Sequence, residues 1–262
     1  YGGEKVFEYE EIGVSTNTMS FDDYLETRKI SYLLEMLYSS RFLREVELFI
    51  EDYKLEYFNF FHYVYEQLKN APEKVKAVIQ SLENDSIVEC KDTSEKLIEY
   101  YSEKNNFKNI CDGIEGINVK YKHKGLMLSN YNIDAWLEFV FSCLKQFLTL
   151  NNIEIGKDYD DIKLFTVSKF NGILDPEKTH LSIINSFNYD VISWTNQQDR
   201  TKTLKTYNSK EYRIKFFFNK NQITQRVNLF KQFKNYTSYD LANIVEIIYP
   251  PHNIHRKYQI DN

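Results

Sequence analysis

The sequence predicts a mainly α-helical protein: a helical array preceded by one strand, with a small α+β part at the C-terminal end. The 262 residues include only 8 glycines and 4 prolines, so there are few helix breakers. From Ser20 onward, apolar side chains recur at the spacing of one helix face. Strand-like runs rich in aromatic and β-branched residues lie near both ends, at Lys5–Val14 and Tyr212–Phe218.

The opening segment predicts a strand that runs directly into a capped helix. Ser20 is followed by Asp23 three residues later, a pattern close to a capping box. A single strand cannot satisfy its own hydrogen bonds, and the following residues offer few strands to pair with it. Because the sequence also starts at Tyr1 and not at methionine, we expect residues 1–19 to be the last strand and linker of an upstream sheet domain absent from this chain.

A helical domain is expected over residues 20–190. The periodicity predicts three helices up to Asn70, with breaks near Ser39 and Lys54. Turn residues then predict a loop near Asp112 and a turn over Gly125–Asn130. The remaining expected helices follow Pro72 to about Asn84, span Thr93–Phe107, run from a cap at Asn132 to a stop at Gly156, and span Asp158–Phe170. The segment Leu181–Trp194 fits either a helix or extended chain.

Residues 191–262 are expected to form a small basic subdomain of one strand and two helices. The strand is Tyr212–Phe218, and alternation places Ile214, Phe216 and Phe218 on its core face. Arg213, Lys215 and Phe217 would then point outward. Helices are expected near Gln222–Phe233 and over Ser238–Ile248, with the Ser238 hydroxyl as the cap, and Pro250 and Pro251 end regular structure.

Charge is distributed unevenly along the chain. The net charge is −5 overall, with 13 basic and 22 acidic side chains in residues 1–111 and 12 basic and 4 acidic ones in residues 200–262. Cations beside aromatic residues can bind nucleic acid, and such a stretch runs from Arg213 through Arg226, Lys231 and Lys234. Alternation turns half of its strand inward, however, so we expect a solvated face or a docking surface for the acidic helices, not a nucleic-acid interface.

No catalytic residue or metal ligand is predicted within the chain, and no cofactor is expected to be held by this chain alone. Cys90, Cys111 and Cys143 are 21 and 32 residues apart, which is no metal-ligand spacing, and we expect them to be small core residues in a reducing, cytoplasmic setting. His252 and His255 follow two prolines and are expected in an exposed tail. No run of 18 apolar residues predicts a membrane span.

Neighbouring carboxylates are interpreted as solvated helix faces, because adjacent side chains point in different directions. These pairs are Asp22–Asp23, Glu51–Asp52 and Asp160–Asp161. Glu8, Glu10 and Glu11 are the exceptions, because they lie on the expected strand, where alternation could turn one carboxylate toward a cavity of the barrel. The candidates for contact with a substrate or cofactor are Ser15, Thr16 and Thr18. They follow the first strand, at the end where parallel barrels place their active sites.

Two runs of sequence carry a resemblance to a known family. The first is VFEYEEIxVSTxTMSFDDYLETR, from Val6 to Arg28, and the second is FxYDxxxW, from Phe187 to Trp194, followed by the strand-like Tyr212–Phe218. In this order they resemble the C-terminal region of radical S-adenosylmethionine proteins that carry a cobalamin-binding domain, starting where the catalytic barrel ends. The resemblance spans most of the chain, but its motifs are structural.

The resemblance implies a parent enzyme that uses a [4Fe-4S] cluster, S-adenosylmethionine and cobalamin for methyl transfer or a related reaction. The CxxxCxxC motif that defines the family's chemistry is absent from this sequence, as is the cobalamin-binding domain. The implied partner is therefore an upstream barrel of the same polypeptide. The rival interpretation is a non-enzymatic helical interaction module, with RNA binding through residues 200–262.

The motif positions imply structural or docking roles for Tyr24, Arg28, Tyr189, Asp190 and Trp194. Arg28 lies four residues after Tyr24, so the two share a helix face. We expect Arg28 to be a partly buried cation that ties the first helix to the barrel rim. The alternative is an exposed arginine that pairs with Asp23, Glu26 or no residue.

Overall fold

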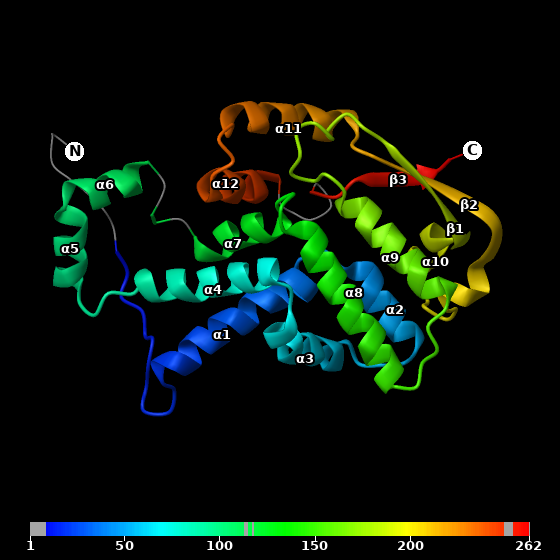
Figure 1. Cartoon of the computed structure of the whole chain (residues 1–262), viewed down its shortest axis with the longest axis horizontal. Helices are drawn as coiled ribbons and strands as arrows, with labels where there is room; N and C mark the ends of the chain where they lie inside the picture. The colour runs from blue at the N-terminus through cyan, green and yellow to red at the C-terminus, as the bar shows by residue number, and fades with distance from the viewer. Residues whose placement is uncertain (1–8, 113–114, 117, 249–253, 262) are drawn as a thin grey trace.

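The computed structural model describes residues 9–112, 115–116, 118–248 and 254–261 and confirms a mainly helical chain with a small three-stranded antiparallel sheet (Figure 1). The α-helices are α1 (Phe21–Leu34), α2 (Arg44–Asp52), α3 (Tyr57–Gln67), α4 (Glu73–Val88), α5 (Ser94–Ser102), α6 (Lys104–Cys111), α7 (Val119–Leu128), α8 (Ile133–Leu150), α9 (Lys157–Phe170), α10 (Val191–Thr195), α11 (Lys220–Gln232) and α12 (Ser238–Ile248). The shorter helical turns are η1 (Glu35–Ser39, π-helical), η2 (Leu68–Asn70) and η3 (Leu204–Tyr207). The strands are β1 (Ile183–Tyr189), β2 (Asn208–Phe217) and β3 (Lys257–Ile260).

The helices form an array with the sheet at one end. Helices α5 and α6 lie at the opposite end, beside the N-terminal segment, while α1, α4, α7 and α8 occupy the middle (Figure 1). Helices α11 and α12 lie along one long side, where α12 packs on α7. Helix α9 packs on β1, and α2 packs on α9, so the sheet is joined to the array through these two helices.

The sheet has the strand order β1-β2-β3, and both neighbouring pairs are antiparallel. The expected alternation of β2 is confirmed, because Ile214, Phe216 and Phe218 are buried. Phe216 faces Ile183 of β1 and Tyr258 of β3. The ambiguous segment before Trp194 thus contains a strand and a short helix. The division expected at residue 190 stays a prediction, with β1 and β2 pairing across it.

The opening strand is not observed where the structure describes it. Tyr9–Val14 has no regular secondary structure, and Lys5–Glu8 lies outside the described residues. Tyr9 and Ile12 are largely exposed. Within the described ranges no strand lies beside this segment to take up its backbone hydrogen bonds, which an isolated strand requires. The capping box is confirmed: Ser20 and Asp23 bond each other's backbone N–H groups at the start of α1.

Three helix boundaries differ from the sequence-based expectation. Helix α4 continues through Asn84 to Val88, because the Ser86 hydroxyl donates to the Leu82 carbonyl 2.7 Å away and does not break the helix. The helix expected over Thr93–Phe107 is split at Glu103, whose backbone is extended. Gly156 lies at the start of α9 and does not end α8, which already ends at Leu150. A Cβ at Gly156 would lie 2.8 Å from Asp158 Oδ1, so this position at the start of α9 favours glycine.

The turn expected at Gly125 is instead the middle of α7. A Cβ on Gly125 would lie 2.7 Å from the backbone carbon of Leu241 on α12. Glycine is therefore required here for close contact between two helices, not for a turn. Asn132 does precede α8, but its side chain donates to the Leu126 carbonyl at 2.9 Å and does not cap the helix.

Two expectations about the C-terminal part were also wrong. The cap of α12 is Thr237, not Ser238, because the Thr237 hydroxyl accepts from the Asp240 N–H at 3.1 Å. His255 is buried between the rings of Phe42 and Phe170, so the chain there is not an exposed tail. Burial was missed because it depends on Phe42 and Phe170, which are distant in the sequence. The expectation that regular structure ends at the two prolines was wrong as well, since β3 follows them. His252, Pro250 and Pro251 lie outside the described residues.

We predict that Gly125→Ala lowers the free energy of unfolding by about 1–3 kcal/mol, because the added methyl group would push α7 away from α12. Urea unfolding followed by circular dichroism measures this change. Gly13→Ala is the matched control, since nothing lies within 4 Å of a Cβ at Gly13. Equal stability of the two variants would contradict the close helix contact.

Candidate functional site

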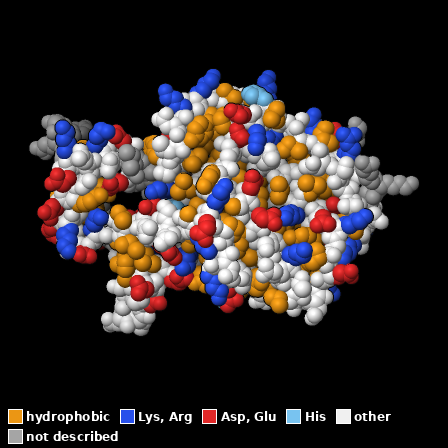
Figure 2. All heavy atoms as spheres, viewed as in Figure 1, with side chains coloured by type: hydrophobic (Ala, Val, Ile, Leu, Met, Phe, Trp, Pro, Cys, Tyr) orange, Lys and Arg blue, Asp and Glu red, His pale blue; other side chains and the backbone are white. Residues whose placement is uncertain are grey.

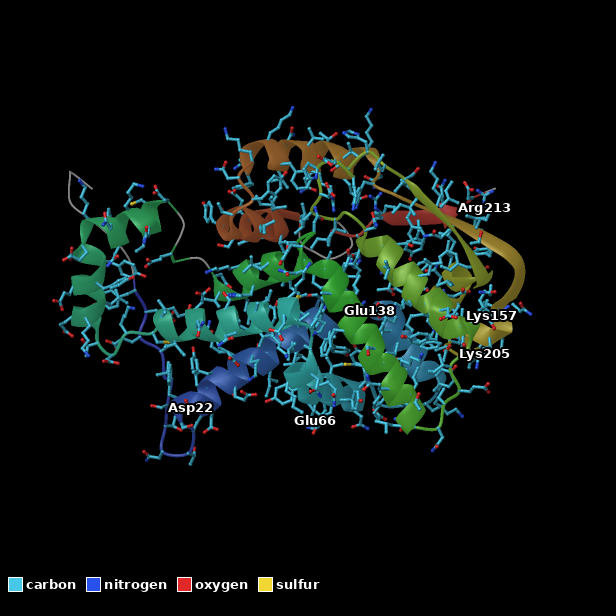
Figure 3. All side chains as sticks on the ribbon, viewed as in Figure 1. Asp22, Glu66, Glu138, Lys157, Lys205 and Arg213 are labelled. Atoms are coloured by element: carbon cyan, nitrogen blue, oxygen red, sulfur yellow. The ribbon has the colours of Figure 1, made fainter. Side chains whose placement is uncertain are left out.

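Three buried aspartates hold the segment between β1 and β2 against the helical array. Asp52 ends α2, while Asp158 and Asp161 lie in the first two turns of α9. Their carboxylates accept hydrogen bonds from groups between residues 188 and 204 and from Tyr53. This polar junction, defined by the three aspartates, lies at the sheet end of the molecule, where Figure 3 labels Lys157 and Lys205.

Asp52 accepts three of these bonds. Its Oδ2 accepts from the Trp194 indole Nε1 at 2.8 Å and from the Leu204 backbone N–H at 2.7 Å. Its Oδ1 accepts from Arg200 Nη2 at 3.0 Å. The Arg200 guanidinium also donates to the carbonyl of Leu48 on α2 and lies over the Trp194 ring, 5.0 Å from its centroid. One carboxylate therefore fixes three points of the segment 194–204.

Asp161 binds the end of β1. Its oxygens accept from the Asn188 backbone at 2.7 Å, the Asn188 side chain at 2.9 Å and the Tyr189 backbone at 2.9 Å. The next residue, Asp190, caps α10 through the Ser193 N–H at 2.8 Å. The chain thus leaves β1 and enters α10 with each of these donors bonded to a carboxylate.

Asp158 has the least complete hydrogen bonding of the three. Its Oδ2 accepts from the Tyr53 hydroxyl at 2.5 Å and lies 3.5 Å from Lys205 Nζ. Its Oδ1 is buried without a hydrogen-bond partner among the described residues. Burial, followed by the bond to Asp158, raises the pKa of Tyr53. The phenol therefore stays protonated and acts as a donor at neutral pH.

Burial also governs the electrostatics of the two more fully bonded aspartates. It raises the pKa of Asp52, and the bonds from Leu204, Arg200 and Trp194 oppose that rise without cancelling it. The pKa of Asp161 is raised for the same reason, against the bonds from Asn188 and Tyr189. The arrangement is a set of acceptors for backbone, indole and guanidinium donors, which suits positioning a segment of chain.

The sequence-based interpretation of acidic pairs was therefore wrong at two positions. Asp52 and Asp161 are buried acceptors, while their neighbours Glu51 and Asp160 are exposed, as expected for adjacent side chains that point apart. A signal was available in the sequence, because a buried tryptophan usually needs an acceptor for its indole N–H. Nothing in the sequence identified Asp52 as that acceptor, since 142 residues separate it from Trp194.

The motif residues near Trp194 all lie at or beside this junction. Phe187 is buried against Phe165 of α9, with ring centroids 6.1 Å apart. Tyr189 and Asp190 form the bonds described above, and Trp194 is fully buried. The second of the two runs that carry the resemblance, Phe187–Trp194, therefore lies at the polar junction.

The candidates of the first run lie elsewhere. Ser15, Thr16 and Thr18 are exposed, and the Thr16 hydroxyl accepts from the Thr18 and Met19 N–H groups at 3.2 and 3.1 Å. Among the described residues they form a turn before α1, in which Thr16 bonds with Thr18 and Met19. Their expected contact with a substrate or cofactor stays a prediction.

Arg28 is partly buried and pairs with neither Asp23 nor Glu26. Its Nη1 donates to the Tyr24 hydroxyl at 2.9 Å and to the carboxylate of Glu89, which follows α4. The Arg28 and Glu89 side chains are 23% and 37% exposed, so the pair remains in contact with solvent. The described contacts of this arginine thus tie α1 to α4.

The three cysteines do not form a metal site. Cys143 is buried in the middle of α8, where burial raises the pKa of its thiol to about 12. Cys90 is half-buried and Cys111 is exposed, so the expectation of three core cysteines holds only for Cys143. Within the described ranges, no three His, Cys, Asp or Glu side chains are arranged to hold a metal ion.

Comparison with known proteins identified no relative: no family model, curated protein or solved structure matches this chain. In the part of the chain that the structure describes, no helix combines the length and apolarity needed to cross a membrane.

We predict that Asp52→Ala lowers the free energy of unfolding by about 3 kcal/mol, because it leaves the buried indole and amide N–H groups and a guanidinium without their acceptor. Glu51→Ala is the matched control, since its exposed carboxylate lies 3.7 Å from Arg200 and should contribute under about 1 kcal/mol. Chemical denaturation of both variants provides the comparison, and similar losses would argue against the junction.

Proposed function

We propose that this chain is the C-terminal accessory region of a cytoplasmic radical S-adenosylmethionine enzyme with a cobalamin-binding domain, and that its partner is the upstream barrel of the same polypeptide. The proposal rests on the order of the two sequence runs, Val6–Arg28 and Phe187–Trp194, which resembles the order in that family. Cluster, S-adenosylmethionine and cobalamin would all be bound outside this chain.

The places of the motif residues support this assignment. Ser20 and Asp23 cap α1, Arg28 joins it to Glu89, and Trp194 bonds Asp52. Each of these interactions maintains the fold, and none is arranged for chemistry. Motifs with such roles are what an accessory region would share with relatives whose reactions differ.

An exposed apolar stripe near the first run offers a surface for the upstream barrel. Ile30, Leu34 and Tyr38 follow one another at four-residue spacing along α1 and η1 and are 36%, 37% and 48% exposed. Residues at this spacing share a helix face. Beyond it, Phe58 at the start of α3 is 67% exposed. Contiguous exposed apolar surface is typical of an interface.

The described residues do not fit an iron-sulfur cluster. A [4Fe-4S] cluster needs several thiolates brought together, whereas Cys90, Cys111 and Cys143 lie on separate elements and Cys143 is buried in the core. The chain is therefore assigned no step of the radical chemistry. In the proposal it binds and closes the barrel that carries out that chemistry.

RNA binding through the basic C-terminal part is the second candidate. It is favoured by Lys220, Lys231 and Lys234, which are exposed on and next to α11, along the side of the molecule where Figure 2 shows several Lys and Arg side chains. It is weakened by Arg226 and Arg256, which are buried and cannot reach a phosphate backbone. Fewer surface cations remain than the sequence indicated.

The decisive experiment extends the coding sequence upstream and compares the longer product with residues 1–262. Expressed and reconstituted without oxygen, the longer protein is expected to hold iron and sulfide and to cleave S-adenosylmethionine to 5′-deoxyadenosine. The present chain alone should hold no cluster. An upstream sequence without CxxxCxxC, or a longer protein without iron, would refute the proposal, and RNA bound by residues 200–262 would favour the second candidate.

We predict a coupling free energy of about 1 kcal/mol between Arg28 and Glu89 in this chain, because both side chains are partly solvated. A double-mutant cycle with Arg28→Ala and Glu89→Ala, followed by thermal unfolding, measures it. In the longer protein, Arg28→Ala should be more destabilising, by about 2–4 kcal/mol, if the barrel rim buries the arginine further. Identical effects in both proteins would exclude a rim contact.

A further inference from the structure

Two buried guanidinium groups lie where α11 meets the chain that leads into β3. Arg226 is 0% exposed and Arg256 is 1% exposed. The ring of Phe218 contacts both, with the guanidinium carbons 4.0 and 4.4 Å from its centroid. Two like charges buried this close together are strongly unfavourable unless an anion or a full set of acceptors compensates them.

Each of the three guanidinium nitrogens of Arg256 has an acceptor. Arg256 donates through Nε to the Asn171 carbonyl at 2.7 Å, through Nη2 to Lys178 at 3.0 Å and through Nη1 to Leu181. These carbonyls belong to the chain between α9 and β1. Arg256 thus has a structural role and needs no further partner.

Arg226 does not have a full set. Among the described residues, only its Nη2 has an acceptor, the Ile254 carbonyl, while Nε and Nη1 are buried without a hydrogen-bond partner. His255 Nε2 is likewise buried, with no partner in the described part of the chain. No salt bridge from a described carboxylate reaches Arg226, and burial followed by the charge of Arg256 lowers its pKa to about 10. At neutral pH the guanidinium therefore remains charged.

The surroundings are electropositive. Burial, followed by the charges of Lys169, Arg226 and Lys257, holds the pKa of His255 well below its usual value, so the imidazole is neutral. The nearby buried carboxylate, Glu45, is already engaged by Lys169 Nζ, which lies 2.7 and 2.8 Å from its two oxygens. Glu45 therefore does not compensate the charge of Arg226.

We propose that Arg226 and His255 form a buried binding site for one small monovalent anion, with chloride as the natural occupant. The free Arg226 N–H groups and the Nε2–H tautomer of His255 supply the donors, and the anion supplies the missing negative charge. We assign a halide because both side chains are buried and only three of their nitrogens lack an acceptor among the described residues, which is few for the four oxygens of a tetrahedral oxyanion. This site is independent of the proposed function.

The direct test is a crystal of the chain grown or soaked in bromide, measured at the bromine absorption edge. An anomalous peak within hydrogen-bond reach of Arg226 Nε or Nη1 is the expected result. A water molecule at that position, or no density there while bromide is found elsewhere, would overturn the proposal.

A solution measurement tests the same site independently. Replacing gluconate by chloride at constant ionic strength should raise the melting temperature saturably, by about 5 °C when chloride is 100-fold above its dissociation constant. Arg226→Met should abolish this dependence. The matched control is Arg213→Met, because Arg213 lies on β2 with 53% of its side chain exposed (Figure 3) and should retain it.

The methionine side chain occupies the space of the aliphatic part of Arg226 and carries no charge, so the variant is expected to fold. Chloride dependence that persists in Arg226→Met, or that is absent in the wild-type chain, would overturn the proposal. If Arg226→Met does not fold, the bromide crystal of the wild-type chain still decides the question.

Discussion

The attachment of the sheet end of this molecule to the helical array depends on the hydrogen bonds that the Asp52 carboxylate accepts. The segment between β1 and β2 must cross from the sheet to α2 and back, and it buries an indole N–H, a backbone N–H and a guanidinium on the way. Buried donors without acceptors are strongly destabilising, and one carboxylate at the end of α2 serves all three. Asp161 does the same for the end of β1. The segment's path is therefore set by acceptors on the helices more than by its own short helix α10.

The same requirement explains the other buried polar groups. Lys169 of α9 and Glu45 of α2 are almost fully buried, and the ammonium lies within hydrogen-bond distance of both carboxylate oxygens. This ion pair and the Asp52 bonds both involve α2, so α2 is the element through which the sheet end is attached to the array. Arg256 follows the rule with three carbonyl acceptors. Arg226 departs from it, and that departure is the physical basis of the anion site.

The sequence identified those features that depend on local chemistry. The capping box at Ser20, the alternation around Phe216 and the breaks between the first three helices all follow from residues close together in the chain, and all are observed. Features set by distant partners were missed. Gly125 was interpreted as a turn because its neighbour in space, the backbone of Leu241, is more than a hundred residues away in the sequence. Asp52 was interpreted as solvated because the donors that it binds, such as the Trp194 indole, are also distant in the sequence. His255 was assigned to an exposed tail because burial there depends on Phe42 and Phe170.

We expect the polar junction to hold the segment 188–207 as firmly as the helical core is held. The most direct measurement is native-state hydrogen exchange by NMR at two protons bonded to Asp52, the Leu204 amide and the Trp194 indole N–H. Both should exchange slowly, with opening free energies near that of global unfolding and close to those of amides in the middle of α8. Exchange of either proton at the rate of an unprotected group, while the α8 amides remain protected, would show that the segment opens independently of the core and that Asp52 does not hold it.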